Sequence, residues 1–182
     1  LFSGARSSAA EFGHMQFIPN GAKCRCGARG CIEAYAGDYA IWRAAHGLPE
    51  DALPPVDLSG LDMRTLAKKA RASDGPERRA FHEAAEAIGT GLASLFALTD
   101  PVPIAFVGSG TEAFDIAEPT IRACIASSNA GGFESNFDFE IYESELPLIR
   151  KGATTTALQA VDEKLSAGME AGHVEATLAE IA

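Results

Sequence analysis

Three of the four cysteines, Cys24, Cys26 and Cys31, fall within eight residues, and His14 precedes the first of them by ten positions. Between His14 and Cys24, the Pro-Asn-Gly sequence at 19–21 favours a turn that brings the chain back toward the histidine. Any fold of this chain must therefore accommodate a dense group of sulfur and imidazole donors near its N-terminal end.

Three interpretations of this group remain open. A disulfide between Cys24 and Cys31 would close a short loop worth about 2.5 kcal/mol, and a reducing cytosol would open it. A catalytic dithiol normally has two residues between its cysteines, whereas Arg25 alone separates Cys24 from Cys26. A structural Zn²⁺ held by one imidazole and three thiolates would complete a tetrahedron, and such sites contribute about 10–16 kcal/mol in small zinc peptides. The larger stabilisation favours zinc.

The remaining sequence alternates helical and strand patterns, which predicts an α/β architecture. Ser73 and Asp74 are candidate caps for the longest helix, and Pro76 suits an early helical position. The predicted elements are a helix over 33–46 interrupted at Gly37, a proline-rich acidic loop or insertion over 47–62, a helix over 73–100, a strand and glycine turn over 101–110, a helix from Thr111 or Glu112, a strand over 137–142 and a helix over 152–165.

Two glycines lie inside the longest predicted helix, at Gly89 and Gly91. Each costs about 1 kcal/mol relative to alanine in a helix. We therefore expect a packing reason for them, such as the close approach of a neighbouring strand.

Two carboxylates flank the cysteine group. Glu11 lies three residues before His14, so both would project to the same side of a helical turn. Glu33 follows Cys31 by two residues. Carboxylates accept paired hydrogen bonds from vicinal hydroxyl groups, which makes both residues candidate contacts to a hydroxyl-rich ligand. Alternatively, Glu11 caps one helix and Glu33 starts another, both in solvent.

Residues 9–36, AAEFGHMQFIPNGAKCRCGARGCIEAYA, resemble the signature of the ROK family (repressors, open reading frames and sugar kinases). In that signature, Glu-x-Gly-His precedes Cys-x-Cys-Gly-x-x-Gly-Cys-x-Glu. The resemblance implies structural zinc ligands at His14, Cys24, Cys26 and Cys31. It also implies contacts to sugar hydroxyls at Glu11, His14 and Glu33.

Later stretches, including AIGTGLASLFALTDP, IAFVGSG and GATTTALQA, are also similar to the C-terminal lobe of this family. The resemblance implies that residues 1–182 form a single incomplete lobe of an actin-like ATPase (ribonuclease H-like) fold. A zinc-binding loop would span 14–31 and an acidic insertion 47–62, and the N-terminal lobe would be absent.

The glycine turn after the predicted strand is the part that would meet a nucleotide in family members. A strand, glycine turn and helix N-terminus present backbone N–H groups to phosphate, although such turns also serve merely to reverse the chain. The implied nucleotide-binding residues are Gly108, Ser109, Gly110 and Thr111.

Three functions remain open. EAYAGDYAIWR and the acidic stretch after it resemble ROK transcriptional regulators, which implies a sugar-sensing, zinc-stabilised effector domain that meets DNA only through an upstream domain. The alternative is half of an ATP-dependent, glucokinase-like sugar kinase that uses ATP and Mg²⁺. We assign no catalytic residue, because the kinase Asp-x-Gly loop and Asn-Asp pair are not in this sequence. The third is a freestanding zinc-stabilised interaction module.

The charge of the chain narrows its partners. A formal net charge of -10 disfavours direct contact with nucleic acid or an anionic membrane surface. No apolar stretch reaches the roughly 20 residues that a membrane-spanning helix needs. We therefore expect a cytoplasmic protein whose partner is a small molecule or another protein. The family resemblance implies that it binds a sugar or amino sugar and forms a homo-oligomer.

Overall fold

The computed structural model describes residues 4–6, 9–53, 63–127, 138–142, 144 and 146–181, with side chains as far as residue 166. The chain forms two compact units, Leu1–Glu143 and Ser144–Ala182. Among the described residues, no helix combines the length and the apolar character needed to cross a bilayer.

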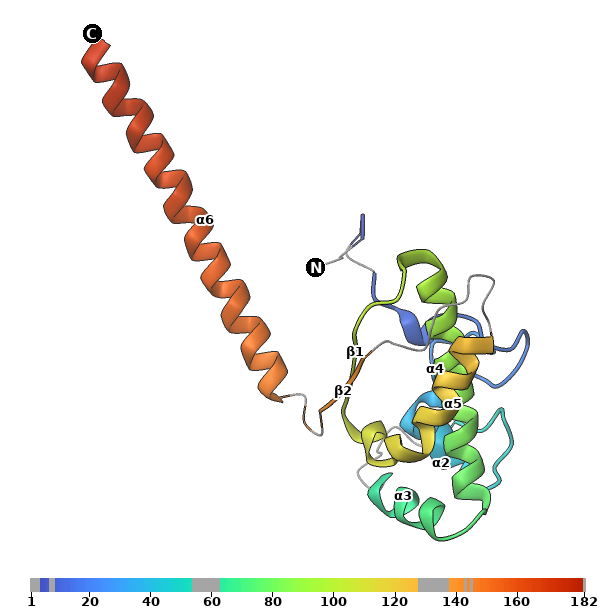
Figure 1. The fold of residues 1–182 in the computed structure, drawn as a ribbon. Helices are drawn as coiled ribbons and strands as arrows, with labels where there is room; N and C mark the ends of the chain where they lie inside the picture. The colour runs from blue at the N-terminus through green and yellow to red at the C-terminus, as the bar shows by residue number, and fades with distance from the viewer. Residues whose placement is uncertain are drawn as a thin grey trace. The chain divides into compact units, whose positions relative to one another are not determined.

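The second unit is dominated by one helix, α6 (Leu146–Ile181). The predicted helix over 152–165 is confirmed as part of this longer element (Figure 1). Several of its apolar side chains are exposed, namely Leu146, Ile149, Leu158, Val161 and Leu165.

The first unit is built around the long helix α4 (Pro76–Thr99), with α5 (Phe114–Ser127) running beside it (Figure 1). Pro76 occupies the first turn, as predicted. The predicted caps at Ser73 and Asp74 are wrong, because Gly75 is the N-cap and no side chain caps the helix there. The helix starts later because proline fixes the backbone of its first turn.

A two-stranded parallel sheet lies against these helices. Strands β1 (Ile104–Val107) and β2 (Phe139–Tyr142) pair in register from Ile104 with Phe139 to Val107 with Tyr142. Between them the chain passes through a short 3-10 helix, η2 (Ser109–Ala113), and then α5. The strand predicted over 137–142 is confirmed over Phe139–Tyr142. Asp138 precedes the strand, and residue 137 lies outside the described residues.

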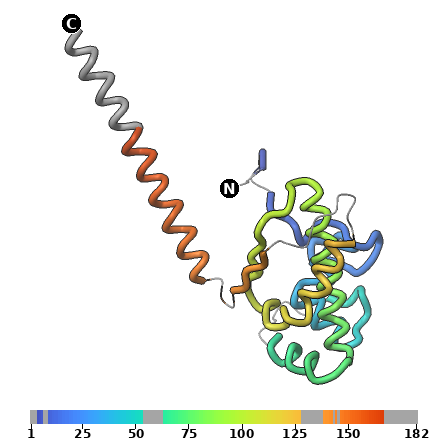
Figure 2. The backbone as a smooth tube through the Cα atoms, viewed as in Figure 1, coloured from blue at the N-terminus to red at the C-terminus, as the bar shows by residue number. Residues whose placement is uncertain are grey.

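The helix predicted over 33–46 is confirmed as α1 (Glu33–Ala36) and α2 (Asp38–Ala45), separated at Gly37. Both contact α4. The tube in Figure 2 follows the chain from the N-terminal loop into these helices. This arrangement places the residues that follow the cysteine group directly on the core.

Helix α3 (Met63–Ala72) was not predicted from the sequence. Its buried side chains fall at the i, i+3, i+4 and i+7 positions of a helix, so the pattern was available. They are Met63, Leu66, Ala67 and Ala70. The acidic stretch 47–62 precedes this helix, and its residues 54–62 lie outside the described residues.

Gly89 and Gly91 do have packing reasons, but the neighbours are not strands. A Cβ at Gly89 would lie 2.7 Å from Cys124 Cβ and 2.9 Å from the Ile121 carbonyl oxygen, both on α5. A Cβ at Gly91 would overlap Ile32 Cδ1 and approach Phe12. The two glycines therefore let α5 and the N-terminal segment pack closely on α4.

We expect Gly89→Ala to lower the free energy of unfolding by about 1–3 kcal/mol, because overpacking a core costs that much. By helix propensity alone the substitution would stabilise the protein, because alanine is a better helix former than glycine. Urea denaturation of the protein would measure the change. Gly110→Ala is the control, since a Cβ there meets nothing within 4 Å. A Gly89→Ala variant as stable as the wild type would show that α4 and α5 are not held this closely.

Candidate metal centre

The cysteine loop is folded by backbone hydrogen bonds. Two isolated antiparallel bridges join Gln16 to Cys31 and Lys23 to Arg29. The Ile32 N–H also donates to the Met15 carbonyl at 2.9 Å. The loop thus returns to its starting point, which sets Cys31 beside the segment that carries His14.

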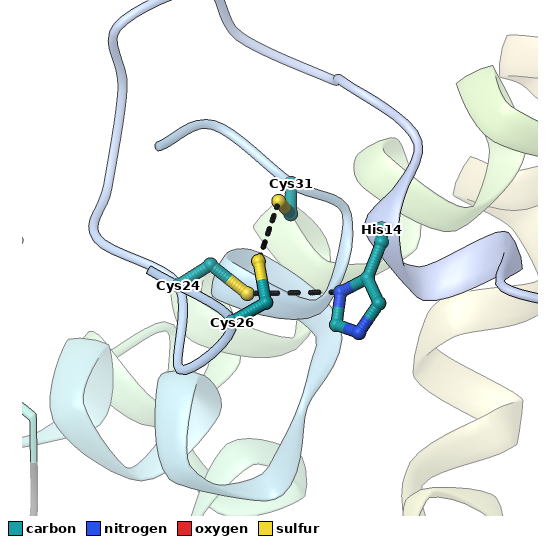
Figure 3. Close-up of side chains that lie close together, drawn as sticks. All are labelled: His14, Cys24, Cys26 and Cys31. Carbon is teal, nitrogen blue, oxygen red and sulfur yellow. Dashed lines mark hydrogen bonds between the residues drawn. The ribbon is translucent and has the colours of Figure 1, made fainter. Parts of the chain in front are cut away.

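A tight turn shapes the Cys-x-Cys segment. The Cys24 N–H donates to the Ala28 carbonyl at 2.9 Å, and the Gly27 N–H donates to the Cys24 carbonyl at 3.1 Å. Gly27 has φ +93, a left-handed conformation that favours glycine. The turn directs the sulfurs of Cys24 and Cys26 toward the same point as Cys31 (Figure 3).

The four predicted donors come together. One ligand atom from each of His14, Cys24, Cys26 and Cys31 lies within 4.8 Å of the others. Cys26 Sγ is 3.7 Å from Cys31 Sγ, and Cys24 Sγ is 3.8 Å from His14 Nδ1 (Figure 3). A tetrahedron with Zn–S bonds of about 2.3 Å has S–S edges of about 3.8 Å. The donor set therefore fits a zinc ion in both chemistry and spacing.

The environment of the thiols also favours a cation. All four cysteines of the chain are free thiols. Burial, and then the neighbouring sulfurs, raise the pKa of Cys31 to about 12. The Ala28 backbone hydrogen bond, followed by one from Cys24, lowers the pKa of Cys26. Three clustered sulfurs cannot all ionise easily by themselves, and a divalent ion supplies the charge that makes them thiolates.

The imidazole of His14 lies between two carboxylates. Its Nε2 is 3.5 Å from Glu11 Oε2, and its Nδ1 is 3.5 Å from Glu33 Oε2. His14 ends the 3-10 helix η1 (Phe12–His14), and Glu33 begins α1. Glu11 occupies the N-cap position of η1 without a side-chain capping bond. The predicted sugar contacts are thus neighbours in space, and their contact with a sugar stays a prediction.

The glycine turn after β1 is held by its own side chains. Thr111 Oγ1 donates to the Gly108 carbonyl at 2.7 Å, and Ser109 Oγ donates to Asp38 Oδ2 at 2.5 Å. Asp38 is the first residue of α2. Gly108 has φ +95, and a Cβ at Gly110 would meet nothing within 4 Å. These four predicted nucleotide contacts form one turn, and nucleotide binding there stays a prediction.

Arg43 is buried, only 3% exposed, and was not predicted from the sequence as part of this site. Its guanidinium donates to the carbonyls of Ala34, Glu50 and Ala52. It therefore ties α1, directly after the cysteine loop, to residues 50–52. An arginine four residues after Tyr39, on the same helix face, was the available signal.

Residues 50–52 also support the loop from outside. The Lys23 N–H donates to the Glu50 carbonyl at 3.2 Å, and Arg29 pairs with Asp51 at 2.5 Å. This segment lies at the start of the stretch that the sequence suggested was an insertion. Its residues 50–52 therefore support the cysteine loop.

Comparison with known proteins places this site in a family. The ROK family profile matches residues 1–146. The DNA-binding transcriptional dual regulator NagC of Escherichia coli strain K12 and the N-acetylglucosamine repressor of Escherichia coli strain CFT073 are each 29% identical over 147 residues, which cover 80% of this chain and 36% of theirs.

A solved structure adds the fold. The ROK family glucokinase from Streptomyces griseus, in complex with glucose and AMPPNP, is 31% identical with a TM-score of 0.52. The match covers 73% of this chain and 46% of that one. This chain therefore spans less than half the length of these relatives. The predicted α/β fold and family are confirmed, and the chain belongs to the ROK family.

Proposed function

We propose that this chain is the zinc-stabilised, sugar-sensing lobe of a ROK transcriptional regulator. The observation that carries the proposal is the clustering of four metal donors within 4.8 Å of one another. One of them, His14, has a carboxylate oxygen 3.5 Å from each of its ring nitrogens. DNA would be bound by another part of the protein, since this chain is acidic.

His14, Cys24, Cys26 and Cys31 would hold the zinc. Four protein ligands leave no open position, so the ion would supply structural stability and a fixed loop. His14 Nδ1 is the ring nitrogen close to Cys24. With Nδ1 engaged, the Nε2–H is free to donate to Glu11 or to a ligand hydroxyl.

The sugar would be recognised by Glu11, His14 and Glu33. Two carboxylates accept hydrogen bonds from hydroxyl groups, and one imidazole donates between them. Glu33 is partly buried, with its side chain 34% exposed, which strengthens its hydrogen bonds relative to those in open water. The names of the relatives point to a hexose or an N-acetylhexosamine.

The kinase is the second candidate, supported by the similarity to the Streptomyces griseus glucokinase. In that case Gly108, Ser109, Gly110 and Thr111 would bind ATP with Mg²⁺. However, the Ser109 hydroxyl already donates to the Asp38 carboxylate. A carboxylate beside the turn repels the negative charge of a phosphate chain. We therefore place the regulator first.

Titration calorimetry of the full-length protein with glucose and N-acetylglucosamine tests the shared sugar site. We expect Glu33→Gln to weaken binding by roughly 10- to 100-fold, because hydrogen bonds to charged groups contribute about 1.5–3 kcal/mol. Glu118→Gln is the matched control, since Glu118 pairs with Arg122 on α5.

If neither sugar produces a binding heat, the result would contradict the sugar site and favour a zinc-stabilised interaction module. Phosphorylated sugar formed from ATP would favour the kinase. Binding without phosphorylation, together with sugar-dependent release from DNA, would support the regulator. Light scattering in the same samples would test the expected homo-oligomer.

A further inference from the structure

The hydroxyl group of Tyr39 is buried without a partner. Tyr39 is 3% exposed, and its hydroxyl oxygen has no hydrogen bond among the described residues. A buried, unpaired polar group costs about 1–3 kcal/mol. Such a group in a native fold calls for an explanation.

Tyr35 provides the contrast within the same pair of helices. It is similarly buried, at 4% exposed. Its hydroxyl oxygen accepts a hydrogen bond from the Ala22 N–H at 2.8 Å. The unpaired state of Tyr39 is therefore not a general feature of tyrosines behind this loop.

The neighbour of the Tyr39 hydroxyl is the Cys24 side chain. Burial, and next the adjacent Cys24 side chain, raise the pKa of Tyr39, whereas the Arg25 backbone N–H lowers it. The Arg25 guanidinium lies 4.4 Å from the centroid of the Tyr39 ring. The ring is thus packed against the Cys-x-Cys turn, with its hydroxyl next to the Cys24 side chain.

We propose that Tyr39 is a positioning residue of the metal centre, whose hydroxyl donates a hydrogen bond to the Cys24 thiolate when the metal is bound. This inference rests on the proposed metal site. Cys24 is 0% exposed, so solvent does not supply a donor to its sulfur. Donors in the outer shell of a metal site fix the orientation and basicity of its ligands. The bound ion would make Cys24 a full thiolate and thereby satisfy the Tyr39 hydroxyl.

Tyr39→Phe tests the proposal because it keeps the ring beneath Arg25 and removes only the donor. The probe is Co²⁺ added to chelator-stripped protein, read by its sulfur-to-cobalt charge-transfer band. Loss of the hydrogen bond raises the energy of the sulfur lone pair. We expect the band to move to lower energy and Co²⁺ binding to weaken by roughly 10-fold.

Tyr35→Phe is the matched control. It removes the acceptor of the Ala22 N–H, so it should lower stability while leaving the charge-transfer band at the wild-type position. Thermal melting gives a second test of Tyr39→Phe, because the variant should change the melting temperature in opposite directions without and with metal. Without metal the variant should melt at or above the wild-type temperature, since an unpaired hydroxyl is gone, and with metal it should melt below it.

The outcomes separate the two proposals. Suppose that wild-type protein binds Co²⁺ with a sulfur-to-cobalt band and that Tyr39→Phe has the same band and affinity. This result would overturn the role of Tyr39 but not the metal centre. A lower melting temperature for Tyr39→Phe in both metal-free and loaded protein would also overturn it, as a packing effect. Wild-type protein without any sulfur band would overturn the metal centre, and the role of Tyr39 with it.

Discussion

Cys24→Ser is expected to lower the free energy of unfolding by more than about 3 kcal/mol, a fraction of the about 10–16 kcal/mol that structural zinc contributes in small peptides. Cys24 is fully buried beside the other donors of the centre. A serine hydroxyl does not ionise near neutral pH and is a poor ligand for zinc. Three ligands would remain around an ion that needs four.

Guanidinium denaturation with and without a strong chelator would measure this effect. The chelator should destabilise the wild type and leave Cys24→Ser nearly unchanged, because that variant has already lost the metal. Cys124→Ser is the control, since Cys124 lies on α5 outside the cluster. Two results together would refute the metal centre as a source of stability. The two variants would lose equal free energy of unfolding, and the chelator would not change the stability of the wild type.

The clustering of the four donors was predictable because its information is local. His14 and Cys31 are only seventeen positions apart, and the turn-forming residues between them restrict how the chain can return. The spacing of donors was therefore enough to predict that they converge, and the structure confirms it at 4.8 Å. The predicted helices and strands around the cluster followed from hydrophobic periodicity in the same way.

The wrong caps at Ser73 and Asp74 and the missed helix α3 are local errors, whereas the others concern contacts between distant segments. The reason for Gly89 lies on α5, at Cys124 and Ile121. Hydrophobic periodicity predicts that a helix face is buried, but it does not identify the residues that pack on that face. Likewise, Arg43 is buried because carbonyls from α1 and residues 50–52 converge on it. The spacing of Arg43 four residues after Tyr39 is a local signal, but it does not identify the three carbonyls, which are found only in three dimensions.

The glycines of the cysteine loop, Gly27 and Gly30, give the second large prediction. Gly30 has φ +80, and a Cβ there would overlap the Ile18 carbonyl oxygen. The Gly30 carbonyl accepts hydrogen bonds from the N–H groups of Phe17 and Ile18, and its own N–H donates to Ala22. The Ile18 carbonyl oxygen itself accepts a hydrogen bond from the Gly21 N–H at 3.0 Å, so it cannot move aside as a flexible side chain would. Gly30→Ala must therefore open the loop next to Cys31.

Gly27 is the matched control. Its φ of +93 is also left-handed, but a Cβ there would meet nothing within 4 Å. Gly27→Ala should therefore cost only the backbone strain of about 1–2 kcal/mol. Gly30→Ala should cost more than about 3 kcal/mol, since it adds a backbone clash and displaces a ligand.

Denaturation curves and the zinc content of purified protein would distinguish these variants. Gly27→Ala should retain close to one zinc per chain, whereas Gly30→Ala should retain little. Equal zinc content and equal stability in both would mean that backbone strain alone governs the loop, and that the close packing of Gly30 on Ile18 does not set the position of Cys31. The different outcomes expected from two glycines of similar φ follow from what faces each of them, namely the Ile18 carbonyl at Gly30 and open space at Gly27.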